Sequence, residues 1–183
     1  MDQVYIVHGY GADPEKHWFP WLENELAKID IVCQRLAMPE SGNPSVEKWL
    51  QHLEKHLIVN EQTVIVAHSL GCIATLNFLA KNFEKPAGAV FVSGFYQPLE
   101  TFPELSTFSN LYAVQPPLMP FKSYVVASLD DSVVPHKYSD ALAQHLKSDY
   151  IRLPQGGHFL DIEGMTEFPL VLELVKKLLH KPY

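Results

Sequence analysis

The stretch Thr63-Val64-Ile65-Val66-Ala67-His68-Ser69-Leu70-Gly71 decides the fold of this chain. Its first four residues are apolar or β-branched and predict a buried strand, and residues 72–80 predict a helix. A serine between small residues on a strand-to-helix turn is typical of a nucleophile elbow, usually written G-x-S-x-G. Ala67 stands where the first glycine is usual, a mild departure because the sharp turn needs only a small side chain there. A serine before a helix is more often a simple N-cap, so the motif alone leaves both interpretations open.

Strand and helix patterns alternate along the rest of the chain. We expect strands at 4–7, 31–36, 64–67, 89–92, 123–127 and 150–153, and helices at about 14–28, 45–57, 72–80, 136–146 and 171–179. This alternation predicts an α/β fold, an open three-layer α/β/α sandwich with about six mostly parallel strands in one domain, 1–183.

The segment 94–121 does not fit this alternation. It contains five prolines and several aromatic residues. A loop of this length inside a compact domain is usually functional or partly helical. Two interpretations stay open: a lid over the site, or an irregular loop whose aromatic side chains pin it to the core.

Composition excludes several classes of partner. The net charge is -7 and no basic run occurs, which argues against nucleic acid. The start of the chain carries no positive charge and no apolar run approaches a membrane span, so we expect neither a signal peptide nor a membrane contact. The two cysteines, Cys33 and Cys72, are read as core residues in a reducing compartment. We therefore expect a cytoplasmic protein.

The first cluster at a predicted strand end is His8-Gly9-Tyr10-Gly11. Its glycines allow a tight turn whose backbone amides point into a site. The hypothesis is that the Tyr10 amide and the Leu70 amide form an oxyanion hole. A simple glycine turn is the alternative.

The second cluster is Asp130-Asp131, after the fifth predicted strand. A carboxylate there can hold a histidine in its correct tautomer. The two side chains point in different directions, so only one can do this, and we choose Asp131. The alternative is that both cap the next helix.

The third cluster is Gly156-Gly157-His158, after the sixth predicted strand. Its glycines free the backbone, so that the imidazole can reach back over the sheet to the serine. The chain order Ser69, Asp131, His158 is the order expected of α/β-hydrolases. Three separate clusters at the carboxyl ends of strands, where such sheets bind ligands, therefore join the serine in one predicted site.

Taken together, these motifs resemble the small α/β-hydrolases grouped with retinoblastoma-binding protein nine, and most closely their bacterial YdeN-like members. The shared marks are His8-Gly9-Tyr10-Gly11, 17–22, 67–71, 92–95, 130–135 and 157–159, which together span nearly the whole chain. The resemblance implies a compact α/β-hydrolase without a large cap, a triad of Ser69, Asp131 and His158, and a carboxylesterase-like activity. The retinoblastoma-binding motif L-x-C-x-E is absent from the sequence, which weakens an interaction role.

The leading hypothesis is hydrolysis of small carboxylic esters through an acyl-enzyme, with no metal or cofactor. A thioesterase or lactonase would use the same residues, and a protein-interaction module on a hydrolase scaffold is the alternative from another class. His52 and His56 have a spacing that can bind zinc, but Leu53 stands where a metalloprotease needs glutamate. For the substrate pocket we predict five side chains: His8, His68, Trp18, Phe95 and Phe159.

Overall fold

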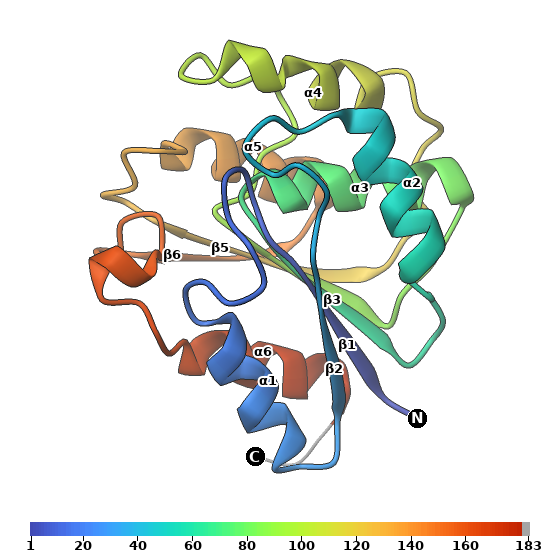
Figure 1. Ribbon diagram of the computed structural model, residues 1–183, viewed down its shortest axis with the longest axis vertical. Helices are drawn as coiled ribbons and strands as arrows, with labels where there is room; N and C mark the ends of the chain where they lie inside the picture. Colours follow the sequence, from blue (N-terminus) through green and yellow to red (C-terminus); the bar gives the residue numbers. More distant parts are fainter. Residues whose placement is uncertain (181–183) are drawn as a thin grey trace.

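The computed structural model describes residues 1–180 (Figure 1). The last three residues of the predicted domain 1–183 lie outside the described part. Six strands form one sheet in the order β2-β1-β3-β4-β5-β6, and every neighbouring pair is parallel. The strands are β1 (Gln3–Val7), β2 (Val32–Leu36), β3 (Thr63–His68), β4 (Gly88–Val92), β5 (Lys122–Ser128) and β6 (Asp149–Leu153).

Burial along the strands follows their place in the sheet. Every residue of the central strands β3 and β4 is buried, whereas the edge strands β2 and β6 keep exposed positions. A parallel strand covered by helices on both faces is buried at every position, so its sequence is an unbroken apolar run. The runs around Val64 and Val90 satisfy this requirement.

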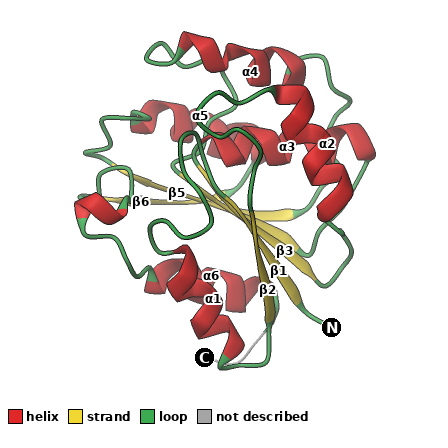
Figure 2. Ribbon diagram, in the orientation of Figure 1, coloured by secondary structure: helices red, strands yellow, loops and turns green. Residues whose placement is uncertain are grey.

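Helices cover both faces of the sheet (Figures 1 and 2). The helices α1 and α6 pack with one apolar cluster, and α2, α3, α4 and α5 pack with a second cluster on the other face. The helices are α1 (Phe19–Ala27), α2 (Val46–His56), α3 (Leu70–Asn82), α4 (Ser106–Tyr112), α5 (His136–Leu146) and α6 (Pro169–Leu178), with short 3₁₀ turns at Pro103–Leu105 and Asp161–Glu163. The predicted three-layer α/β/α fold is confirmed.

The first helix begins later than its sequence pattern suggests. The prediction placed it at about 14–28, but α1 begins at Phe19. His17 has φ 58°, a left-handed conformation that interrupts a right-handed helix. Pro20 then occupies the first turn, where a missing N–H costs nothing.

The segment 94–121 is partly helical. It contains the turn Pro103–Leu105 and the two-turn helix α4. Phe95 and Phe108 are 1% exposed and belong to the core on the α3 face. These two aromatic side chains therefore pin the segment to the core, as one of the two interpretations requires.

Within residues 1–180, no helix is both long enough and apolar enough to cross a bilayer.

Candidate active site

Ser69 lies at the sharp turn between β3 and α3. Its backbone has φ 55° and ψ -122°, which is unusual for a residue other than glycine and is a strained geometry found at functional turns. A Cβ at Gly71 would lie 2.7 Å from the carbonyl oxygen of His8. Only glycine lets the first turn of α3 come this close to the chain that leaves β1.

The turn at 8–11 packs directly against this elbow. A Cβ at Gly9 would lie 2.9 Å from the Cβ of Ser69 and 3.4 Å from the amide nitrogen of Leu70. Within residues 1–180, neither the Tyr10 amide nor the Leu70 amide has a backbone hydrogen-bond partner. Two unpaired amides beside a strand-end hydroxyl suit an anionic oxygen.

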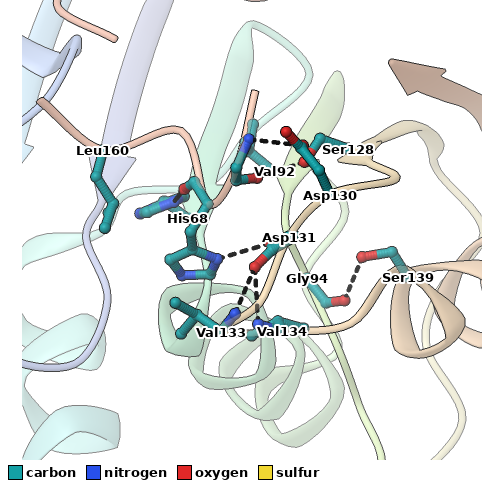
Figure 3. Close-up of polar contacts among 12 residues, drawn as sticks. His68, Val92, Gly94, Ser128, Asp130, Asp131, Val133, Val134, Ser139 and Leu160 are labelled. Atoms are coloured by element: carbon teal, nitrogen blue, oxygen red, sulfur yellow. Dashed lines mark hydrogen bonds and ion pairs between the residues drawn. The ribbon is translucent and has the colours of Figure 1, made fainter. Parts of the chain in front are cut away.

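Asp131 and His158 form a buried pair at the same edge of the sheet. Figure 3 labels Asp131, whose carboxylate is joined by dashed lines to an imidazole and to the amides of Val133 and Val134. The Nδ1 of His158 is 2.8 Å from Oδ2 of Asp131, and the two side chains are 5% and 0% exposed. The other oxygen, Oδ1, accepts hydrogen bonds from the amides of Val133 and Val134 at 2.8 and 2.9 Å. The carboxylate is thus held from both sides. Since it accepts from Nδ1, the Nε2 of a neutral His158 carries no proton.

Asp130 has a different position from its neighbour. Its Oδ1 accepts a hydrogen bond from the Gly157 amide at 2.9 Å, and this bond is the largest cause that lowers the pKa of its carboxyl. Of the two adjacent aspartates, the structure therefore places Asp131 against the imidazole and Asp130 against the backbone beside it.

Side chains from several elements bind the backbone of residues 156–161, which we call the base loop. Ser128 donates a hydrogen bond to the carbonyl of Gly157. Glu163 accepts from the amides of His158 and Leu160 at 2.9 and 3.0 Å. The Nε2 of His68 lies 2.8 Å from the carbonyl oxygen of His158. These contacts fix the loop on both sides of the imidazole.

Sequence reasoning missed Glu163 and His17 in this arrangement. Glu163 is an exposed acid in an irregular stretch, and its only sequence signal is its distance of five residues from His158. The Nδ1 of His17 accepts a hydrogen bond from the Asp161 amide at 3.1 Å. That contact joins residues 144 positions apart, so no local pattern could reveal it.

The predicted pocket residues lie mostly in the core. Trp18 and Phe159 have no exposed surface and pack with the cluster on the α1 and α6 face. Phe95, at 1% exposure, belongs to the opposite cluster. These three side chains lie in the interior, and their place in a substrate pocket stays a prediction.

The two predicted pocket histidines lie at the carboxyl ends of strands, His8 directly after β1 and His68 as the last residue of β3. His8 and His68 are 1% and 2% exposed. The Nε2 of His8 accepts a hydrogen bond from the Met38 amide at 3.0 Å, and its Nδ1 lies 2.9 Å from the carbonyl oxygen of Gly9. Burial lowers the pKa of both imidazoles. Both imidazoles are therefore neutral, and both bind backbone groups close to the site.

A cavity of about 770 Å³ lies elsewhere, along α4 and the carboxyl end of α5. Its lining includes Tyr96, Tyr112, Met119, Phe121 and His145, and the predicted catalytic residues do not contribute to it. The ring of Tyr96 stacks on His145 at 4.3 Å. Most of the segment 96–121 thus encloses this cavity rather than the elbow.

One side chain of that segment does reach the site region. The ring of Phe102 lies 6.0 Å from the ring of Tyr10, which is 40% exposed. The neighbouring Thr101 donates a hydrogen bond to the carbonyl of Val133 at 3.4 Å. Phe102 therefore stands between the turn at 8–11 and the loop that carries Asp131.

Among residues 1–180, no group of three or more His, Cys, Asp and Glu side chains is arranged to hold a metal ion. The rings of His52 and His56 on α2 lie tilted against each other, with centroids 4.3 Å apart.

A six-stranded parallel sheet, helices on both faces and a strained serine at a strand-to-helix elbow define an α/β-hydrolase fold. The chain belongs to the serine hydrolase family, whose sequence model matches residues 4–177. The putative hydrolase YdeN of Bacillus subtilis is 37% identical over 178 residues, 94% of each chain. The crystal structure of the B. subtilis ydeN gene product superimposes with a TM-score of 0.89 at 35% identity, covering 99% of this chain and 100% of that one. The serine hydrolase RBBP9 of Rattus norvegicus is 25% identical over 186 residues, 96% of this chain and 94% of its own.

Proposed function

We propose that this serine hydrolase cleaves small carboxylic esters through an acyl-enzyme, with Ser69 as nucleophile, His158 as base and Asp131 as its orienting carboxylate. The single observation that carries the proposal is the buried Asp131–His158 bond of 2.8 Å at the strand ends that also present Ser69. A carboxylate on Nδ1 leaves Nε2 as the free basic nitrogen, which is what a serine hydroxyl needs for activation.

The proposed reaction follows from these positions. Ser69 Oγ attacks the ester carbonyl carbon while Nε2 of His158 takes the hydroxyl proton. The carbonyl oxygen becomes an oxyanion and accepts hydrogen bonds from the amides of Tyr10 and Leu70. The carbon–oxygen bond to the alcohol then breaks, and His158 returns the proton to that alcohol. Water repeats the sequence on the acyl-enzyme, which releases the acid and restores Ser69.

Within residues 1–180 no hydrogen bond joins Ser69 to His158, so the contact between Ser69 Oγ and Nε2 of His158 is part of the proposal. Catalytic hydrogen bonds are often long before substrate binds and shorten in the substrate complex. Both residues, Ser69 and His158, are nearly buried, at 8% and 4% exposure. The proposal requires Ser69 Oγ and Nε2 of His158 to come within hydrogen-bond distance when substrate binds.

The test uses p-nitrophenyl esters of increasing acyl length and a fluorophosphonate probe. Ser69→Ala should lose both turnover and labelling, with a fall of at least roughly 10⁵-fold in kcat. The matched control is Ser93→Ala. Ser93 also follows a central strand, has φ 49° and is fully buried, but no helix begins after it. Labelling that survives in Ser69→Ala and disappears in Ser93→Ala would refute the proposal.

The same variants tested with thioesters and lactones decide which acyl bond is preferred. A wild-type chain that neither turns over these substrates nor reacts with the probe would favour the interaction-module alternative. The cytoplasmic location and the ester as the only required partner stay predictions.

A further inference from the structure

His68 stands immediately before the proposed nucleophile, and its side chain lies beside His158. It leaves the last position of β3 and enters the layer of α1 and α6, where its ring contacts those of His17, Trp18 and Phe19 at 5.4, 6.1 and 5.9 Å. The residue is 2% exposed. This surrounding is aromatic, and apolar packing by itself does not call for an imidazole at position 68.

The polar half of the ring has one partner. The Nε2 of His68 is 2.8 Å from the carbonyl oxygen of His158, whereas Nδ1 has no partner among the described residues. A carbonyl only accepts, so Nε2 must carry the proton and Nδ1 must be bare. Burying an unpaired ring nitrogen is unfavourable. The bond to the His158 carbonyl is therefore the one polar contact within residues 1–180 that accounts for an imidazole at this buried position.

A second histidine continues the same support. The ring of His17 lies beside that of His68, and its Nδ1 accepts a hydrogen bond from the Asp161 amide at 3.1 Å. Two imidazoles in edge-to-face contact thus hold the base loop at two points, the carbonyl of residue 158 and the amide of residue 161.

We propose that His68 is a positioning residue: its Nε2–H holds the backbone carbonyl of His158, so that the His158 ring faces Asp131 on one side and Ser69 on the other. This inference rests on the proposed function. It links nucleophile and base through the chain itself, because neighbouring residues 68 and 69 carry the support and the hydroxyl. A shift of β3 then moves Ser69 and the base loop together.

The ring must stay neutral to do this. A proton on Nδ1 would place a positive charge 4.8 Å, between ring centroids, from the imidazole that becomes an imidazolium during the reaction. Burial, followed by the neighbouring His158 and His17, lowers the pKa of His68 well below its ordinary value. The buried aromatic surrounding therefore supports the assigned role.

The experiment compares His68→Phe, which fills the space but lacks the donor, with His68→Gln, whose amide reaches the former position of Nε2. In His68→Phe, kcat should fall roughly 10- to 100-fold with KM nearly unchanged, because a displacement of about 1 Å costs up to about 10²-fold. His68→Gln should recover most of kcat. His52→Phe, on the outer face of α2, is the matched control and should keep the wild-type kcat.

A spectroscopic readout separates positioning from packing. The proton in the Nδ1–H bond between His158 and Asp131 should give a far-downfield proton resonance in the wild type and in His68→Gln, and a broadened or lost one in His68→Phe. If His68→Phe fails to fold, ¹⁵N spectra of the wild-type histidines decide. They should report a neutral His68 with the proton on Nε2, and a proton on Nδ1 overturns the inference.

The outcomes also separate this inference from the proposed function. If Ser69→Ala is inactive while His68→Phe keeps wild-type kcat and the downfield resonance, the positioning role is wrong and the triad stands. If Ser69→Ala keeps wild-type turnover, the proposed function fails, and the positioning role fails with it.

Discussion

The base loop, 156–161, and the segment 94–121 are both irregular, but different interactions hold their backbones in place. In the base loop, hydrogen bonds from Ser128, Asp130, Glu163 and His68 fix the backbone around one imidazole. The longer segment is held by buried aromatic side chains, and it borders a cavity of about 770 Å³. Directional bonds set one geometry, whereas apolar packing tolerates several. The loop that carries the proposed base, His158, thus has the kind of support that sets one geometry.

The largest effect is expected from removing the Asp131 carboxylate, which binds the imidazole of His158 in the base loop. Asp131→Asn should lower kcat about 10⁴-fold, equivalent to about 5.4 kcal/mol, because an amide favours the wrong imidazole tautomer. The measurement is steady-state hydrolysis of a p-nitrophenyl ester.

Asp130→Asn is the adjacent control. The asparagine oxygen can still accept from the Gly157 amide, so the loss should stay below about tenfold. A larger loss in Asp130→Asn than in Asp131→Asn would show that the two roles are reversed.

In the longer segment, the largest expected effect concerns stability rather than rate. Phe108 packs on Trp49 with ring centroids 5.6 Å apart and is 1% exposed. Phe108→Ala should lower the free energy of unfolding by about 3–5 kcal/mol, as measured by urea denaturation. The KM of the folded fraction should not change, and a changed acyl-length preference would contradict the view that Phe108 serves only packing.

Acid should lower the stability of the fold through two buried histidines. Burial lowers the pKa values of His8 and His68, so the unfolded chain binds more protons below its ordinary histidine value of about 6.5. Their contribution is complete above that pH and decreases as the pH falls toward the folded values. Each group should cost up to about 1.4 kcal/mol per pH unit there.

Thermal unfolding between about pH 7 and pH 5 measures this effect. The variant His68→Gln should show a shallower dependence on pH than the wild type. An identical slope would mean that His68 takes up no proton on unfolding.

The smallest expected effect tests the lid interpretation. Phe102 is only partly buried, and its ring lies beside that of Tyr10 at the site. Phe102→Ala should change the ratio of kcat/KM between short and longer acyl esters by about 10-fold, since a hydrophobic pocket discriminates weakly. The stability should change by less than about 1 kcal/mol. An unchanged ratio would remove Phe102 from the substrate-binding surface and the lid from consideration.

Much of the fold followed from local sequence patterns. Unbroken apolar runs such as Val64–Val66 can only be central parallel strands once helices alternate with them, and the observed β3 and β4 agree with their predicted positions within one or two residues. The start of α1 was wrong because the left-handed conformation of His17 depends on its contact with Asp161. Local patterns do not contain that contact.

In the candidate site too, some residues were recognisable from local sequence and others depended on distant contacts. Ser69 and His158 were recognisable because their glycine-rich or small neighbours serve local turns. The pocket role of Trp18, Phe95 and Phe159 stays a prediction, but their burial could not be foreseen, since side-chain direction at a loop depends on the packing of distant elements. His68 could be placed near the serine from sequence, but its bond to His158 joins residues 90 positions apart and required the full fold.

The strand order has a consequence for how the molecule assembles. β1 lies between β2 and β3, and every neighbouring pair is parallel, so each pairing closes a long stretch of chain. Topologies rich in such distant contacts fold slowly. The last strand, β6, pairs at the edge of the sheet, and the loop that carries His158 follows it. A nascent or refolding chain therefore cannot complete the proposed site before β6 has paired with β5. Recovery of turnover after dilution from denaturant should therefore lag behind the recovery of helical signal.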